Sequence, residues 1–134
     1  MSAGVVGVGC GAAILAENRL LLVKRRKAPE AGFWSLPGGK VEFLERAEEA
    51  VVREIAEEIG VAIVLGPLLC LIQMIGVDDQ HWVSPVYRAS IEAGEPVNRE
   101  PDKIEAIGWF ALEAPPAPLA IAAREAIAHL RAAE

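Results

Sequence analysis

The sequence predicts an α/β fold in which a mixed β-sheet is sandwiched between α-helices. Short apolar segments separated by polar turns are typical of strands, and two other segments carry apolar residues at three- and four-residue steps, as amphipathic helices do. The order of these segments is β-β-β-α-β-β-β-α, which is expected to place helices on both faces of one sheet. With 134 residues, the chain is expected to form a single domain over residues 1–134.

Three strands are expected before the first helix. Gly4 to Leu15 is small and apolar, which is typical of a strand buried on both faces. Arg19 to Lys24 is the predicted second strand, and it is expected to form a hairpin with the first. Phe33 to Lys40 is predicted to be one short strand that ends in a glycine-rich turn, where the backbone can approach a ligand closely.

Three more strands and a second helix are expected after the first helix. Val61 to Val77 is almost wholly apolar and indicates a long or bent strand. His81 to Ile91 is the next predicted strand, and Pro85 favours an edge position or a bulge because proline cannot donate to a ladder. Ile104 to Phe110 is the last predicted strand, and an amphipathic helix is expected from about Leu119 to Arg131.

The first helix is predicted from Arg46 to Ile59, with Gly60 in the position of a left-handed C-cap. Glu54, Glu57 and Glu58 are spaced i, i+3 and i+4, so their carboxylates project from one side of this helix. Like charges at this spacing repel one another, whereas Mg²⁺ and Mn²⁺ prefer carboxylate oxygens as ligands. The ordinary interpretation of such a charge run is a solvated helix face.

The residues around this helix favour the metal interpretation. Gly39 is followed after five residues by Glu45, and after seven more by the pattern Arg-Glu-aliphatic-X-Glu-Glu-X-Gly-aliphatic, so that nine positions are fixed over 23 residues. With average residue usage, a chance match to these nine positions is on the order of 10⁻⁸ to 10⁻⁷ for the whole chain. The pattern resembles the signature box of the Nudix hydrolases, and every defining position of the box is filled.

The resemblance implies the Nudix fold and a Mg²⁺-dependent hydrolase, with Mn²⁺ as the alternative ion. Glu57 and Glu58 match metal ligands of the family, and the backbone carbonyl in the region of Gly39 often joins them. Glu54 matches a residue that is a ligand or, in some members, the general base. Glu45 matches an outlying glutamate that assists metal binding or orients the other carboxylates.

Two further catalytic groups are implied in the same way. Arg53 matches an arginine that braces a carboxylate by ion pairing, and it lies four residues before Glu57. Family members also commonly supply a carboxylate from the loop before the last strands, and the candidates here are Glu100, Asp102 and Glu105. The Glu-Pro-X-Lys pattern that begins at Glu100 looks like one in Nudix members that cleave nucleoside triphosphates. Glu100 is therefore the preferred extra ligand or base, and a solvated loop charge is the alternative.

The helix start departs from the family pattern. Many members have a glycine before the residue that matches Glu45 and a serine or threonine after it, whose hydroxyl caps the helix. Here Leu44 and Arg46 occupy those positions. Without the capping hydroxyl, Glu45 itself is expected to cap the start of the helix.

Candidate substrate-binding residues are found around the box. Arg25 heads a basic cluster that leads towards it, and Lys40 follows its first glycine. The candidates for stacking on a base are Trp34, His81, Trp82 and Tyr87. Core or edge-strand packing is the alternative role for each of these four.

The expected reaction is hydrolysis of a nucleoside diphosphate linked to another moiety. The favoured substrate is a nucleoside or deoxynucleoside triphosphate, cut to monophosphate and pyrophosphate. ADP-ribose or another nucleotide sugar is the first alternative. A non-catalytic nucleotide sensor is an alternative of another class, and the intact carboxylate set of the box counts against it.

Composition limits the partners. The net charge of −6 argues against a nucleic-acid-binding surface. Cys10 and Cys70 lie in apolar runs and are expected to be buried thiols. No leader and no membrane-spanning run is apparent in the sequence, so a cytoplasmic protein without a membrane partner is expected. The expected partner is a small nucleotide, and a homodimer is left open.

Overall fold

The computed structural model describes residues 4–134, so residues 1–3 of the expected domain lie outside the described residues. The elements follow the expected order, with one additional short strand before the first helix. They are β1 (Val6–Ala16), β2 (Arg19–Arg25), β3 (Trp34–Ser35), β4 (Gly38–Lys40), α1 (Ala47–Ile59), β5 (Ala62–Val77), β6 (Gln80–Ala93), β7 (Ile104–Ala111) and α2 (Ile121–Ala132). Within residues 4–134, no helix has the length and apolarity that a membrane span requires.

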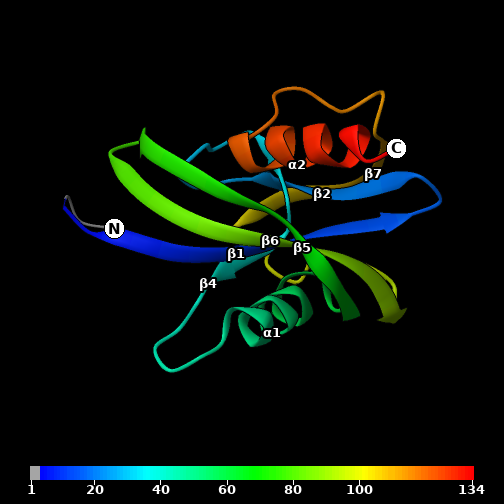
Figure 1. Ribbon diagram of the computed structural model, residues 1–134, viewed down its shortest axis with the longest axis horizontal. Coiled ribbons are helices and arrows are strands. Elements are labelled where there is room, and N and C mark those ends of the chain that lie inside the picture. The colour runs from blue at the N-terminus through cyan, green and yellow to red at the C-terminus, as the bar shows by residue number, and fades with distance from the viewer. Residues whose placement is uncertain (1–3) are drawn as a thin grey trace.

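The strands form one mixed sheet, and each helix covers a different face of it (Figure 1). The strand order is β3-β2-β1-β6-β5, with β4 paired to β1 and β7 paired to β2. β1 and β6 run parallel, whereas the other pairs are antiparallel. The predicted sandwich of a mixed sheet between helices is confirmed.

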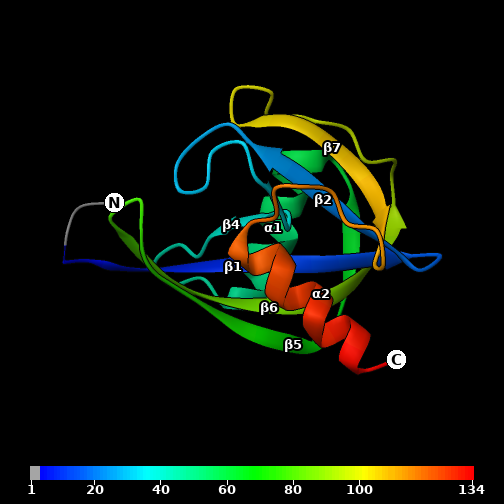
Figure 2. The same cartoon turned by 90° about the horizontal axis from the view of Figure 1, so that it is seen from above.

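The predicted hairpin of the first two strands is present but short. β1 and β2 pair at Leu15 with Leu20 and at Ala16 with Arg19. Beyond these pairs the two strands separate, as Figure 2 shows from above. β1 then pairs with β4 and β6, whereas β2 pairs with β3 and β7. This separation places the glycine-rich strand β4 beside β1.

Two apolar layers hold the helices to the sheet. On one face, Val51, Ile55 and Ile59 of α1 are fully buried among strand residues, as their spacing predicts. On the other face, Ala126 and Leu130 of α2 pack into a second cluster. Burying one aliphatic side chain of this size contributes about 1.5–3 kcal/mol. The helix that carries the box is therefore fixed firmly to the sheet.

The segment expected to be one strand, 33–40, forms two. β3 pairs with β2, placing Ser35 opposite Val23, whereas β4 pairs with β1. Pro37 lies between them and has no N–H for a ladder, so the segment changes partners there. A side chain at Gly38 would overlap the carbonyl oxygen of Cys10, so only glycine fits this close approach to β1.

The expectation that Pro85 marks an edge strand or a bulge is wrong. Its strand, β6, lies between β1 and β5, and Pro85 pairs in regular register with Leu71. On the β1 side, pairing stops after Val83 and resumes in the same register at Val86. The ladder therefore tolerates the missing N–H of Pro85 by a local interruption in the interior of the sheet.

The helix start also differs from the prediction. Helix α1 begins after Arg46, whose N–H donates to the Glu49 carboxylate at 2.9 Å, so Glu49 rather than Glu45 caps it. Leu44 has a φ of 68°, in the left-handed region that favours glycine. At the other end, Gly60 has a φ of 71°, which confirms the predicted C-cap.

Candidate active site

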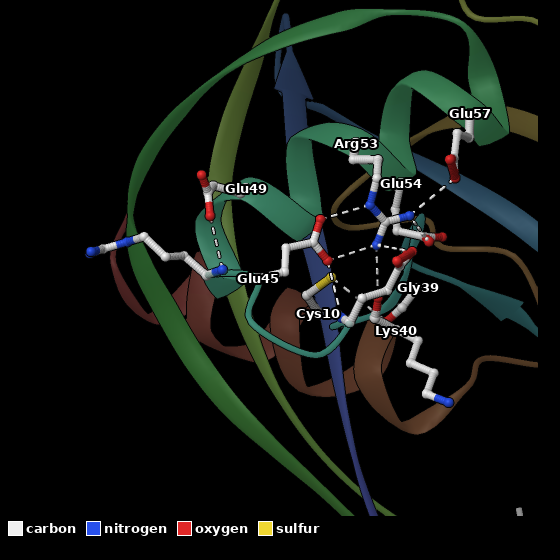
Figure 3. A network of polar contacts seen from close by, with 10 residues as sticks. Cys10, Gly39, Lys40, Glu45, Glu49, Arg53, Glu54 and Glu57 are labelled. Carbon is white, nitrogen blue, oxygen red and sulfur yellow. Dashed lines mark hydrogen bonds and ion pairs between the residues drawn. The ribbon is translucent and has the colours of Figure 1, made fainter.

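The guanidinium of Arg53 is the centre of the polar network on α1 (Figure 3). Its Nε and Nη2 atoms donate to the two oxygens of Glu45, at 2.7 and 2.9 Å. Its Nη1 atom donates to Glu54 at 2.6 Å and to Glu57 at 3.2 Å. Nη2 also donates to the backbone carbonyl of Lys40 at 3.1 Å. One side chain thus joins the loop before α1, the strand β4 and two carboxylates of the helix.

The bidentate partner of Arg53 is Glu45, whereas the sequence suggested Glu57. This pair lowers the pKa of Glu45 to about 2, with the hydrogen bonds from Arg53 as the largest cause. The same contacts raise the pKa of Arg53. Glu45 is therefore ionised and engaged, and its structural effect is to orient the guanidinium that holds Glu54 and Glu57.

Glu54 lies directly against the backbone of the glycine-rich strand. A side chain at Gly39 would overlap the Glu54 carboxylate, so the glycine provides the space for this group. Burial raises the pKa of Glu54, the ion pair with Arg53 lowers it, and the charges of Glu57 and Glu100 raise it further. Strand β4 and helix α1 together place this carboxylate at the wall of a cavity.

Glu58 lies one residue beyond Glu57 but faces the cavity instead of solvent. Its Oε1 atom accepts a hydrogen bond from the N–H of Gly38 at 3.0 Å. Removal from water raises its pKa to about 8, and the charges of Glu54 and Glu100 add to the shift. The side chain of Glu57, by contrast, is 51% exposed and contacts Arg53.

The cavity has a volume of about 420 Å³ and brings together groups from distant parts of the chain. Four carboxylates line it, and these are Glu30, Glu54, Glu58 and Glu100. Four basic residues also line it, and these are Arg25, Lys27, Lys40 and Lys103. Its apolar wall includes Trp82 from β6 and its cross-strand neighbour Met74 from β5. A cavity with acidic, basic and aromatic walls can bind a ligand that combines phosphate with a planar ring.

Glu100 reaches the cavity from the loop between β6 and β7, where the sequence suggested an extra carboxylate. It lines the cavity together with Glu54 and Glu58, and its charge raises the pKa of both. Glu105, another candidate from this loop, forms an ion pair with Lys24 at 3.3 Å and does not line the cavity.

Three of the six candidates for substrate binding line the cavity, namely Arg25, Lys40 and Trp82, whereas Tyr87 does not. Trp34 lies outside it and packs edge-on against Phe110, with ring centroids 4.9 Å apart. His81 also lies outside it, because neighbouring residues of a strand point to opposite faces and Trp82 faces the cavity.

Ser84 and Met74 were missed by sequence reasoning, although both line the cavity. Ser84 follows Trp82 by two residues and therefore shares its face of β6, a signal that was available in the sequence. Both cysteines are buried, as expected. The Cys10 thiol lies at the cavity and donates to the carbonyl of Gly39 at 3.7 Å, and burial raises its pKa to about 11.

Comparison with known families identifies the box and its surroundings. The NUDIX domain matches residues 6–130. The chain belongs to the Nudix family. The recognition of the family from the box is thereby confirmed, and the match extends far beyond the box itself.

Relatives and solved structures agree with this assignment. The CTP pyrophosphohydrolase of Escherichia coli (strain K12) is 33% identical over 132 residues, which cover 91% of this chain and 92% of that protein. The ADP-ribose pyrophosphatase of Methanocaldococcus jannaschii is 41% identical over 80 residues, 59% of this chain. The chain spans about half of that archaeal relative, 47% of its length. The crystal structure of a MutT NUDIX hydrolase from Burkholderia pseudomallei aligns with a TM-score of 0.90 and 52% identity, covering 94% of this chain and 98% of that one.

The Nudix carboxylates are suited to a hard divalent cation by their chemistry. Glu54 and Glu58 are oxygen donors whose charged forms are disfavoured by burial and by neighbouring carboxylates, and a cation would reverse this penalty. Among residues 4–134, no three acidic, histidine or cysteine groups already converge as ligands of one ion. Arg53 holds Glu54 and Glu57, and the Gly38 N–H holds Glu58. The chemistry of these oxygen donors therefore fits a hard divalent cation.

Proposed function

We propose that the protein hydrolyses a nucleoside diphosphate linked to another moiety, with a nucleoside or deoxynucleoside triphosphate as its preferred substrate. The products would be the nucleoside monophosphate and pyrophosphate. The observation that carries this proposal is the cavity, where carboxylates, basic side chains and an indole line one space of about 420 Å³. Such a substrate presents a polyanion to the charged groups and a planar base to the indole.

In this proposal, Glu54, Glu57, Glu58 and the carbonyl of Gly39 hold Mg²⁺, with Mn²⁺ as the alternative. When bound, the ion neutralises phosphate charge and lowers the pKa of a bound water. Arg53 keeps the helix carboxylates in position, because its hydrogen bonds to Glu45 fix the guanidinium.

The proposed chemical step is attack of a water oxygen on phosphorus. The new P–O bond forms as the phosphoanhydride P–O bond breaks, and the bonding electron pair leaves with the departing phosphate. A carboxylate accepts the proton of the water. Glu54 and Glu100 are the candidates, since both line the cavity, whereas Glu45 and Glu57 do not. The raised pKa of Glu54 makes its carboxylate a stronger base than that of an ordinary glutamate.

Substrate recognition is proposed to be divided between two sets of residues. Arg25 and Lys40 would bind the phosphates, and Trp82 would stack on the base. The indole N–H of Trp82 already donates to Gln80 at 2.8 Å, which fixes the ring orientation and leaves its face for stacking. The cavity lies near the lower end of the usual range of about 300–1,000 Å³ for ligand sites, which supports one nucleoside with its phosphates.

A nucleotide-sugar pyrophosphatase is the second candidate, favoured by the 41% identity to an archaeal protein named ADP-ribose pyrophosphatase. Triphosphates remain preferred because the relative named CTP pyrophosphohydrolase aligns with 91% of this chain, against 59% for the archaeal protein. The complete set of box carboxylates supports turnover over a role as a non-catalytic nucleotide sensor.

The test is a turnover panel with Mg²⁺ that includes the ribo- and deoxyribonucleoside triphosphates, ADP-ribose and UDP-sugars. Products would be separated by anion-exchange chromatography, with Glu58→Gln as the inactive control. We expect monophosphate and pyrophosphate from at least one triphosphate at a kcat/KM above that for ADP-ribose. Faster cleavage of ADP-ribose or a UDP-sugar would overturn the substrate class, and turnover indistinguishable from the control throughout would overturn the activity.

A further inference from the structure

The loop that carries Glu100 is attached to the end of helix α1. The N–H of Val97 donates to the carbonyl of Ile59 at 3.0 Å, and the N–H of Arg99 donates to the carbonyl of Glu58 at 2.9 Å. Carbonyls in the last turn of a helix lack partners within the helix. The loop therefore satisfies two of these carbonyls, and its backbone is fixed to the helix that carries Glu54 and Glu58.

The side chain of Asn98 links the two ends of the same loop. Its Oδ1 atom accepts from the N–H of Glu100 at 3.0 Å, and its Nδ2 atom donates to the carbonyl of Ile104 at 2.8 Å. The carbonyl of Glu100 in turn accepts from the N–H groups of Lys103 and Ile104, at 2.9 and 2.8 Å. A primary amide offers a donor and an acceptor together, so alanine cannot make either contact.

We propose that Asn98 is a positioning residue whose side-chain amide holds Glu100 in place at the wall of the cavity that the α1 carboxylates Glu54 and Glu58 also line. The inference rests on the proposed function, in which Glu100 is one of the two candidates for the general base. Because a displacement of a reacting group by about 1 Å can cost on the order of 10²-fold in rate, the loop must be held as firmly as the helix.

A purely structural role for Asn98 makes a different prediction from a positioning role. If Asn98 acts through Glu100, its loss has no further effect once the Glu100 carboxylate is gone. If Asn98 only stabilises the loop, its loss has the same effect in both backgrounds. A double-mutant cycle separates the two roles, because residues that act as a unit are strongly non-additive.

The experiment measures kcat and KM for Asn98→Ala, Glu100→Gln and the double variant on the best substrate of the panel. Val97→Ala is the matched control, because Val97 is 50% exposed and its backbone contact with α1 is kept. We expect Asn98→Ala to lower kcat by about 10–100-fold, the range for residues that support a reacting group, with KM changed by less than about twofold. In the Glu100→Gln background it should change kcat by less than about twofold, as should Val97→Ala in the wild type.

Amide hydrogen exchange gives a readout that does not depend on turnover. In Asn98→Ala the Glu100 amide loses its acceptor and should exchange faster, whereas the Arg99 amide keeps the carbonyl of Glu58 and its protection. Equal loss of protection at both amides would show that Asn98 holds the whole loop and would overturn the positioning role.

Three kinetic results would also overturn it. They are an unchanged kcat in Asn98→Ala, an equal loss in the Glu100→Gln background, and a Glu100→Gln enzyme as active as the wild type. In each of these the wild type still turns over substrate, so the proposed function stands and only this inference fails. An inactive wild type would instead defeat both.

Discussion

Replacement of Arg53 by lysine tests whether one guanidinium organises the carboxylates of the site. Arginine makes five hydrogen bonds here, of 2.6 to 3.2 Å, with three carboxylates and a backbone carbonyl, and it forms an ion pair with Glu42 at 3.3 Å. Lysine keeps the charge, but its single ammonium cannot offer two parallel donors to Glu45 while reaching Glu54 and Glu57. The helix carboxylates would lose their fixed positions although the net charge is unchanged.

The expected loss from Arg53→Lys is about 10–100-fold in kcat, the usual cost of removing a residue that orients metal ligands. KM should change by less than about threefold, because an oriented ligand contributes more to the transition state than to substrate binding. Steady-state kinetics at saturating Mg²⁺ measure both constants, and calorimetry measures the Mg²⁺ affinity. Arg46→Lys is the control, since Arg46 is 75% exposed and contacts one carboxylate at 3.4 Å. An Arg53→Lys enzyme with normal kcat and a raised KM would refute this reasoning and indicate direct contact with the substrate.

Three other predictions concern single residues. Glu100→Gln should lower kcat by about 10²–10⁴-fold if Glu100 is the base. The control variant Glu105→Gln, which loses a surface ion pair with Lys24, should keep a kcat within about twofold of the wild type. Equal kcat in the two variants would remove Glu100 from the mechanism. The pKa of Glu58 rises from 4.5 to about 8 on folding, so its stabilising contribution is present below pH 4.5 and is lost as the pH rises through 8. In EDTA, the Tm of Glu58→Gln relative to wild type should therefore increase by several degrees from pH 5 to pH 8. A constant Tm difference between the two proteins would contradict the pKa shift. Leu44→Gly should raise the free energy of unfolding by up to about 1 kcal/mol, because Leu44 is 89% exposed and has a φ of 68°. If urea denaturation showed a lower stability instead, the leucine would make a stabilising contribution that its contacts do not show.

The elements that local patterns determine were predicted well. The apolar spacing of α1 and the glycine at its end predicted both the helix and its C-cap, because these depend on neighbours in the sequence. The segment 33–40 was predicted as one strand because its two partners, β1 and β2, are far from it in sequence. Pro85 was misplaced for a related reason, since strand order decides whether a strand lies at an edge.

In the candidate site too, contacts between neighbours in the sequence were predicted better than contacts between distant segments. Helical spacing predicted Glu54, Glu57 and Glu58 on one side of the helix, but only Glu54 and Glu58 line the cavity and Glu57 is half exposed. The same spacing suggested the contact between Arg53 and Glu57. The bidentate contact of Arg53 with Glu45 was not predicted, because Glu45 lies outside the helix and the i, i+4 rule says nothing about it. The choice of Trp82 over its neighbour His81 needed the direction of a strand face, which an apolar run does not reveal.

The parallel pairing of β1 with β6 has a consequence for the order of folding. It joins Val6 to His81 and Ile14 to Ala89, residues about 75 positions apart, so the chain between them must close as a long loop before the pairing forms. Trp82 on the cavity wall belongs to β6, and the glycine-rich strand β4 is paired with β1. Early compact species can therefore contain helix α1 and the β5–β6 hairpin while they lack a complete binding site. In refolding experiments, the ability to bind a nucleotide should return with the slowest step that forms native structure, later than the recovery of helical signal.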